Sequence, residues 1–375
     1  MKNLIFLDIF DGMKVNRLFL PMVMIASLFS CSDKNVAVNE VAIEGQMVNI
    51  GDNEDKDVVW FFKDRIYARD TRFNIYSGEL TKTQWKKSDT IFVSGHGHNE
   101  FGHPILSQDH DGVLYLLDRP VEGNKLLSLI KIPHTDSIAA VKDQTGWEKY
   151  DLKQLPPFWV MGTNFEALSD STILVAGAPV NDMKHIFSIV NFKNQAITPL
   201  NYWPDDDTPD NDESTFNKLL VYSHGTDVKG NGKGRHLYWN NSGKIAFIFT
   251  IDGAEINILS CLYNEDHLPL PTSGEAPLTE RICGCSNNDR IYLLYKDSNC
   301  KGEKIEKYDN KDPFPMGNTV EVYDWDGVKQ QVIHLDKFGQ RIMLSDDSKT
   351  LYLYSGWMSD GSDSYIYSYD LSSLK

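Results

Sequence analysis

The sequence predicts an all-β protein, specifically a six-bladed β-propeller of four-stranded antiparallel blades that is closed by an N-terminal strand. A polar turn followed by an apolar strand recurs along the chain, and six copies of this unit are legible. Aromatic residues make up 11% of the 375 residues, and they suit the pleated, half-buried surfaces of sheets. No amphipathic helix of useful length is visible, so a helical or mixed fold is not expected.

The repeated unit fixes the number of blades. Its copies begin at the turns of Asp64-Arg-Ile-Tyr, Asp111-Gly-Val-Leu-Tyr, Asp170-Ser-Thr-Ile-Leu, Ser242-Gly-Lys-Ile-Ala, Asn288-Asp-Arg-Ile-Tyr and Asp346-Asp-Ser-Lys-Thr-Leu-Tyr. They are spaced by about 57 residues on average, slightly more than the roughly 40 to 50 residues of a propeller blade. Six blades with some long loops therefore fill residues 57–375. Two stacked β-sandwiches are the alternative fold.

Two segments are assigned to special roles. The longest gap between copies contains the glycine-rich run Ser223–Gly234, which we interpret as an insertion loop. The last copy ends after its third strand at Leu371, so its fourth strand is missing. The weakly alternating segment Val41–Val48 could supply that strand and close the ring, because an open sheet edge leaves backbone groups unpaired.

The N-terminus predicts export. Lys14 and Arg17 precede the apolar run Leu18–Phe29, which is too short to span a membrane and is typical of a signal peptide. Residues 1–30 are therefore assigned to a signal peptide. Asp8 and Asp11 are unusual in such a segment, and we predict that translation starts at Met13.

A lipid anchor is expected at the end of this segment. Leu28-Phe-Ser-Cys31 resembles a bacterial lipobox, in which Cys31 is lipidated and becomes the first mature residue. Residues 31–56 then form a polar tether that contains the possible closing strand. Ser32 after the cysteine fits retention in the outer membrane, facing either the periplasm or the exterior.

The combination of lipobox, tether and six turn-plus-strand copies resembles secreted bacterial lipoproteins that carry a TolB-like six-bladed β-propeller. The resemblance is best seen at Asp111–Tyr115 and Asp346–Tyr352. It implies the fold and a family mostly without assigned chemistry. No catalytic residue transfers with it, because one fold supports many functions.

The charge of the chain restricts its partners. The formal net charge is −16, which repels the phosphate backbone of nucleic acids, and no basic stripe offsets it. Nucleic acid is therefore excluded as a partner, and a cationic or neutral ligand is mildly favoured. We expect the membrane to be contacted through the lipid anchor only, and the protein to be a monomer outside any complex.

One glycine-rich loop carries the candidate ligand-binding residues. It runs from Ser94 to Pro104, ahead of an inner strand, so it would open onto one face of a propeller near the axis. Imidazoles and a carboxylate can bind ligands or a zinc-like ion, but the spacing matches no metal motif, and no metal or other cofactor is predicted. The candidate ligand-binding residues are His96, His98, Glu100, His103 and, from the long gap, His224.

Other patterns are assigned no chemistry. The carboxylates of Asp205–Glu213 lack the central glycine of an EF-hand and are interpreted as a solvated loop. The turn copies miss the register of the Asp-box of sialidases. The four remaining cysteines, Cys261, Cys283, Cys285 and Cys300, permit two disulfides in an exported protein, with buried free thiols as the alternative.

The leading hypothesis for function follows from these observations. It is a lipoprotein of the outer membrane that acts as a binding or scaffold module for a protein, peptide or glycan through one propeller face. The alternative is an extracellular glycan-active hydrolase or lyase with its site in the propeller funnel. No residue is assigned a catalytic role.

Overall fold

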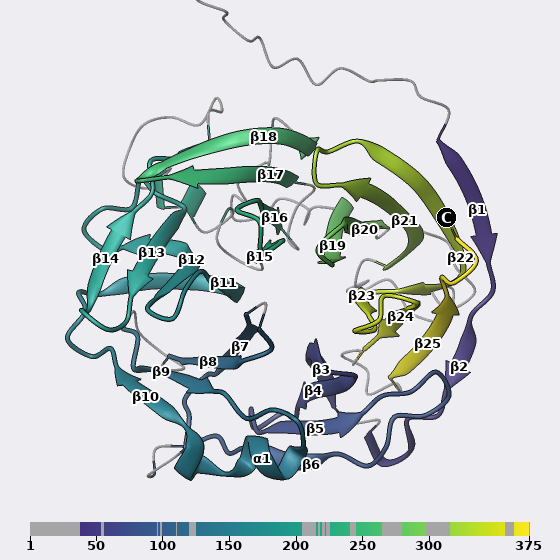
Figure 1. Ribbon diagram of the computed structural model, residues 1–375, viewed down its shortest axis with the longest axis horizontal. Helices are drawn as coiled ribbons and strands as arrows, with labels where there is room; N and C mark the ends of the chain where they lie inside the picture. Colours follow the sequence, from purple (N-terminus) through teal and green to yellow (C-terminus); the bar gives the residue numbers. More distant parts are fainter. Residues whose placement is uncertain are drawn as a thin grey trace, which may run out of the picture. The chain divides into compact units, whose positions relative to one another are not determined.

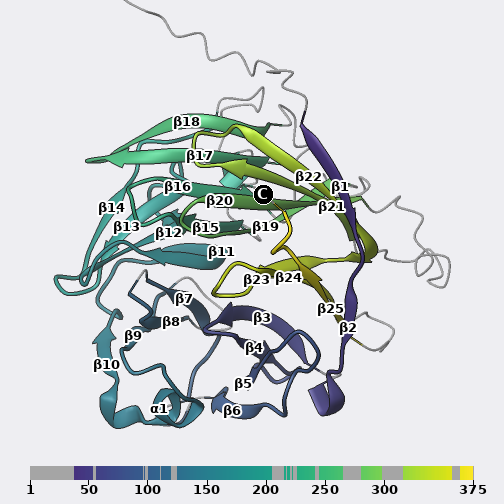
Figure 2. The ribbon, with the colours of Figure 1, turned by 45° about the vertical axis from the view of Figure 1, so that its right-hand side comes forward.

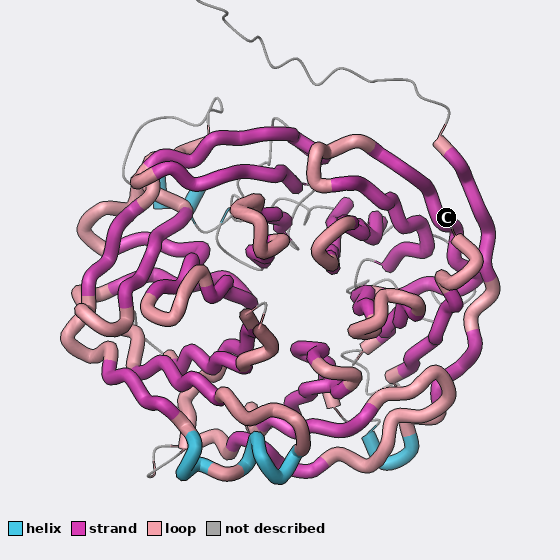
Figure 3. Tube along the Cα trace, viewed as in Figure 1, coloured by secondary structure: helices cyan, strands magenta, loops and turns pink. Residues whose placement is uncertain are grey.

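The computed structural model shows six small antiparallel sheets arranged in a ring, which confirms the predicted six-bladed β-propeller (Figure 1). The structure describes residues 38–53, 56–95, 97, 100–109, 111–119, 125–204, 215–216, 218–219, 222, 226–240, 245–264, 280–297, 316–356 and 364–374. Residues 36–375 form one compact unit. In the part of the chain that the structure describes, strands make up most of the ring and the helices are short (Figure 3).

Blades 1 to 3 each run outward from the axis in sequence order. Blade 1 contains β3 (Asp57–Phe62), β4 (Arg65–Arg69), β5 (Ile75–Glu79) and β6 (Asp89–Phe92). Blade 2 contains β7 (Ile105–Gln108), β8 (Leu114–Asp118), β9 (Ser128–Ile132) and β10 (Glu148–Asp151). Blade 3 contains β11 (Phe158–Ala167), β12 (Thr172–Pro179), β13 (Phe187–Asn191) and β14 (Ala196–Pro199).

The last three blades include the two N-terminal strands, β1 (Asn39–Ile43) and β2 (Gln46–Val48). Blade 4 contains β15 (Thr226–Gly230), β16 (His236–Asn240), β17 (Ile245–Asp252) and β18 (Glu255–Asn264). Blade 5 contains β19 (Glu280–Ser286), β20 (Arg290–Asp297), β21 (Met316–Asp324) and β22 (Lys329–Gly339), with β1 outside them. Blade 6 contains β23 (Arg341–Leu344), β24 (Thr350–Ser355) and β25 (Tyr365–Asp370), followed by β2.

The polar side chains of the recurring turns hold those turns together. Asp109 Oδ1 accepts hydrogen bonds from the backbone N–H groups of Asp111 and Val113. Asn287 does the same for Asp289 and Arg290. Such side chains satisfy backbone donors inside a turn, which is why a polar residue precedes each apolar strand.

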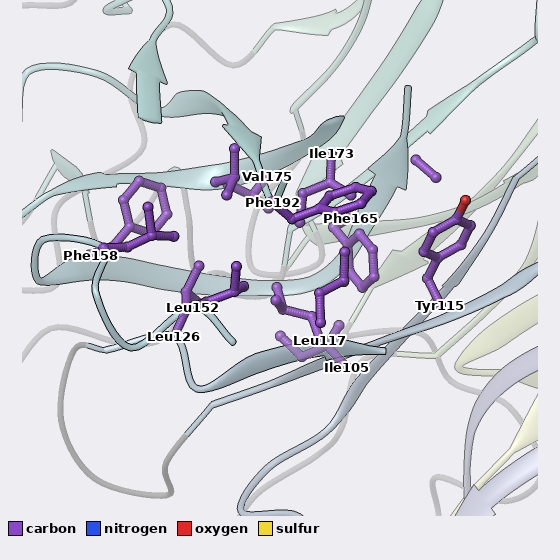
Figure 4. Packing of buried hydrophobic residues seen from close by; sticks show 14 residues of the cluster. Ile105, Tyr115, Leu117, Leu126, Leu152, Phe158, Phe165, Ile173, Val175 and Phe192 are labelled. Carbon is purple, nitrogen blue, oxygen red and sulfur yellow. The ribbon is translucent and has the colours of Figure 1, made fainter. Parts of the chain in front are cut away.

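The core consists of apolar clusters between neighbouring blades. Among the described residues there are six such clusters, one at each of the six blade interfaces. The cluster between blades 2 and 3 includes Ile105 and Leu117 from one blade and Phe165 and Ile173 from the other (Figure 4). Each sheet thus buries both faces against its neighbours, so no blade has a core of its own.

The ring is closed by the N-terminal segment, as predicted, although this segment forms two strands. β2 pairs antiparallel with β25 and supplies the fourth strand of blade 6. β1 instead pairs parallel with β22 and adds a fifth strand to blade 5. The first described residues therefore lie beside the last ones along the rim (Figure 2). Val48 is 3% exposed and belongs to the cluster between blades 6 and 1.

Blade 4 differs from the sequence interpretation. The run Ser223–Gly234 is not simply an insertion, because Thr226–Gly230 is β15, the innermost strand of this blade. Ile245, which follows the turn of the fourth repeated unit, begins the third strand of this blade, β17. Asn231 makes the first hairpin turn of the blade by accepting the N–H groups of Lys233 and Arg235.

Helical structure is short and peripheral. Helix α1 (Ile138–Lys142) lies between β9 and β10, and the side chain of Ser137 caps its N-terminus by accepting the N–H of Ala140. Two single-turn 3-10 helices occupy Gly51–Asn53 and Gln144–Gly146. Within the described ranges, no helix is both long and apolar enough to cross a membrane.

Candidate ligand-binding cavity

The ring encloses an axial cavity of about 1140 Å³. Its walls come from the inner strands and adjoining loops of blades 1, 2, 4, 5 and 6. Drug-sized ligands occupy pockets of about 300 to 1,000 Å³, so this cavity is large enough for a ligand of several sugar or amino-acid units. Aromatic side chains, including Trp60 and Trp239, lie in its wall.

One end of the cavity carries a group of arginines, here called the arginine end (Arg69, Arg119 and Arg341). Strand pairing explains the grouping. Arg69 is the last residue of β4 and pairs with Asp57 at the start of β3. Arg341 starts β23 in blade 6, and Arg119 follows β8 in blade 2. The three side chains therefore come from three consecutive blades, 6, 1 and 2.

The arginine end also contains a carboxylate, which belongs to Asp57. Its oxygens lie 3.2 Å from Arg69 Nη2 and 3.7 Å from Arg341 Nη1. Arg119 lies farther along the wall, where burial and the positive charge of Arg69 lower the pKa of its guanidinium. Three arginines thus share the arginine end with one aspartate among the cavity-lining residues that the structure describes.

An aromatic side chain in a strained loop lies beside Arg69. Phe73 has a φ of 66°, in the left-handed region that costs an L-residue other than glycine about 1–2 kcal/mol. Its ring centroid is 5.7 Å from the Arg69 guanidinium carbon and 5.1 Å from the centroid of the His103 ring. Phe73 also lines the cavity.

Asp70 holds this loop in place. Its carboxylate accepts hydrogen bonds from the backbone N–H groups of Arg72 and Asn74, from the Asn74 amide and from the Tyr76 hydroxyl. The backbone N–H of Asp70 also donates a hydrogen bond to the carbonyl of Asn74. The backbone carbonyl of Asp70 accepts a hydrogen bond from the N–H of Phe73. The position of the Phe73 ring is therefore fixed by a dense local network, as expected for strain that is kept for a function.

His103 completes the group. It is half-buried, and its backbone N–H donates to the carbonyl of Arg119. Burial, followed by the charges of Arg119 and Arg69, lowers the pKa of its imidazole to about 4. The imidazole is therefore neutral at pH 7. Asp118 stabilises the loop that carries His103, because its Oδ1 accepts a hydrogen bond from the N–H of Gly102 at 2.9 Å.

The low pKa of His103 predicts a pH dependence of stability. In the unfolded chain the imidazole takes up a proton near pH 6.5, whereas the folded protein binds it only near pH 4. Stability should therefore fall between pH 6.5 and 4 by about 1–2 kcal/mol, after allowance for solvent screening. Urea denaturation at several pH values should show this loss in the native protein and a smaller loss in His103→Gln. Parallel curves for the two proteins would contradict the assignment.

The opposite end of the cavity is acidic and is called the aspartate end (Asp111, Asp289 and Asp346). These residues lie in the turns that join the first and second strands of blades 2, 5 and 6. Contacts between turns confirm that they share one end, since the Asp346 N–H donates to Asp64 Oδ1 and the Asn287 amide donates to Ser348. Burial, and then the charge of Asp64, raises the pKa of Asp346.

The candidate ligand-binding residues predicted from the sequence lie in different places. His103 lines the cavity. Glu100 instead serves the loop itself, because its carboxylate accepts the N–H of Gly97 at 2.7 Å. His96, His98 and His224 lie outside the described residues. Arg69, Arg119 and Phe73 were not among the candidates predicted from the sequence.

Other sequence patterns have mixed outcomes. Cys283 and Cys285 are free thiols on β19 that face the cavity, whereas Cys300 and Asp205–Asp210 lie outside the described residues. Within the described ranges, no group of three or more His, Cys, Asp and Glu side chains could hold a metal ion.

Comparisons with known proteins agree on the fold. No family model and no curated protein matches the chain. A solved exported protein from Bacteroides fragilis superposes with a TM-score of 0.50 at 8% identity, covering 88% of this chain and 99% of that one. An auxiliary nutrient binding protein from Bacteroides thetaiotaomicron gives 0.44 at 8% identity over 87% and 77%, respectively. The propeller domain of Cps50 from Myceliophteria thermophila gives 0.44 at 9% identity over 87% and 99%. The first of these likenesses shows a shared fold between this chain and the Bacteroides fragilis protein.

Proposed function

We propose that the protein is a lipid-anchored binding module of the bacterial outer membrane that holds a small glycan or peptide in its axial cavity. The cavity of about 1140 Å³ is the observation that carries this proposal. It is bounded by strands that pack on both faces, so its wall is preorganised and little ordering is needed on binding. Charged groups of opposite sign at its two ends would orient a ligand along the axis.

Obstruction of the cavity tests the binding function. In Val59→Trp, a bulky ring replaces a cavity-lining side chain of β3, whereas Val328→Trp makes the same change at an exposed position away from the cavity. Calorimetric titration with a panel of neutral and acidic oligosaccharides and short peptides should detect a ligand of the native protein. Val59→Trp should lose this binding and Val328→Trp should keep it. Binding that survives Val59→Trp, or no binding across the panel, would contradict the proposal.

The proposed anchor has its own test. Cells that produce the native protein should incorporate labelled palmitate into it and retain it in the outer-membrane fraction. Cys31→Ser should abolish both the label and the retention, because the thiol is the site of acylation in a lipobox. Retention of unlabelled Cys31→Ser protein in the membrane would refute the lipid anchor.

A glycan-active lyase is the second candidate, and His103 favours it. A lyase needs a base close to groups that neutralise a sugar carboxylate, and a neutral imidazole lies here beside Arg69 and Arg119. Unsaturated products from acidic polysaccharides, detected by ultraviolet absorbance and absent with His103→Gln, would establish this activity in place of simple binding.

A further inference from the structure

We propose that the arginine end of the axial cavity is a subsite for the carboxylate or sulfate of an acidic sugar, with Arg69 and Arg119 binding the anion and Phe73 contacting the sugar ring. This inference rests on the proposed binding function and adds the chemical class of the ligand. It differs from the expectation drawn from the negative charge of the whole chain, because the local charge of the site has the opposite sign.

The charges around the site support an anion. Arg69 and Arg119 are close enough for the charge of one to affect the other, although like charges repel each other. The nearby Asp57 is shared between Arg69 and Arg341. An oxyanion placed between the guanidinium groups could accept paired hydrogen bonds from a planar fork.

The backbone of Phe73 supports a ligand independently of the charges. A bulky aromatic residue with a φ of 66° is unusual, and the Asp70 network holds it in this conformation. Such local strain is typical of binding sites, where it preorganises a contact group. The ring lies next to Arg69 and His103 in the cavity wall, where an apolar face of a sugar could pack on it.

The depth and wall of the cavity favour a sugar over an isolated ion. Beyond Phe73, the wall of the same cavity includes Trp60. Aromatic rings can contact the apolar faces of successive sugar units, while the acidic group is held at one end. The aspartate end would repel a second anionic unit, so the ligand should carry its charge near the arginine end.

A neutral trisaccharide that ends in a single glucuronate and the methyl ester of that trisaccharide are matched probes for this subsite, since they differ only in one acidic group. The native protein should bind the acidic trisaccharide, or a singly sulfated disaccharide tested in parallel, and should bind the ester at least about 10-fold more weakly. Arg119→Gln and Arg69→Gln should each lose about 10- to 100-fold in affinity, as expected for removal of a hydrogen bond to a charged group. Arg72→Gln, an equal change of charge at an exposed position of the same loop, should bind like the native protein.

Phe73→Asn separates binding from folding, because asparagine tolerates the left-handed conformation. Its melting temperature should not fall, whereas its affinity for the acidic sugar should fall. Equal binding of acid and ester, or equal losses in Arg72→Gln and Arg119→Gln, would overturn the anion subsite while leaving the cavity as a binding site. Tighter binding of triglutamate than of both acidic sugars would overturn the assignment to a sugar. No binding by any probe or panel member would overturn the subsite and the proposed function together.

Discussion

Removal of residues 38–50 is expected to lower the melting temperature of the protein by about 10 °C. This deletion removes β1 and β2 together with Val48 and Ile50, which are 3% and 8% exposed. The lost burial amounts to about 2 kcal/mol for each side chain. The outer edges of β22 and β25 would also lose their partners, which exposes unpaired backbone groups.

Two point variants make this test specific to ring closure. Val48 and Met47 are adjacent in β2, but Met47 is 57% exposed. Val48→Asp should destabilise the protein by about 3 kcal/mol, because it places a charge in an apolar cluster. Met47→Asp should change stability by less than about 0.5 kcal/mol. An unchanged melting curve for the deletion would show that the N-terminal strands do not hold the ring closed.

The second large effect is expected at the interface of blades 3 and 4. Glu166 on β11 and His236 on β16 lie 2.8 Å apart, and their side chains are only 8% and 9% exposed. Glu166→Ala should reduce the free energy of unfolding by about 3 kcal/mol, because it leaves a buried imidazole nitrogen without its acceptor. Glu166→Gln keeps an acceptor and should lose about 1 kcal/mol.

A carboxylate in an exposed pair provides the control. Glu79 is ion-paired with Lys86, and the two side chains are 51% and 56% exposed, so Glu79→Ala should cost less than about 0.5 kcal/mol. Denaturant titration of both alanine variants gives the comparison. Equal losses would mean that the Glu166–His236 pair contributes no more than a surface pair. In the His236→Phe background, the effect of Glu166→Ala should shrink, since the unpaired nitrogen is gone.

The sequence predicted the blades wherever local turn chemistry and strand pattern agree. Asp109 and Asn287 lie in turns that join first and second strands, so the apolar residues after them lie on β8 and β20 as expected. Blade 4 was misread because its inner strand, Thr226–Gly230, is polar and ends in glycine. Its place in the sheet depends on pairing with β16 rather than on its own propensity.

The arrangement of residues around the cavity could not be predicted from the sequence, for a different reason. Arg69 and Arg119 are fifty residues apart, and only the packing of blade 1 against blade 2 makes them neighbours. The left-handed backbone conformation of Phe73 could not be predicted from the sequence, because glycine or asparagine would be expected at such a position. His103 was among the candidates because imidazoles in a loop before an inner strand were considered as ligand contacts, and it lines the cavity.

Closure through β1 and β2 also sets an order of assembly. These strands are synthesised before their partners Gln331–Leu335 and Ile366–Ser368. Until those partners are made, the N-terminal segment has no strand to pair with, so a chain that stops before blade 6 cannot close the ring. The residues of β22 and β25 thus decide whether the blades translated before them become a stable protein.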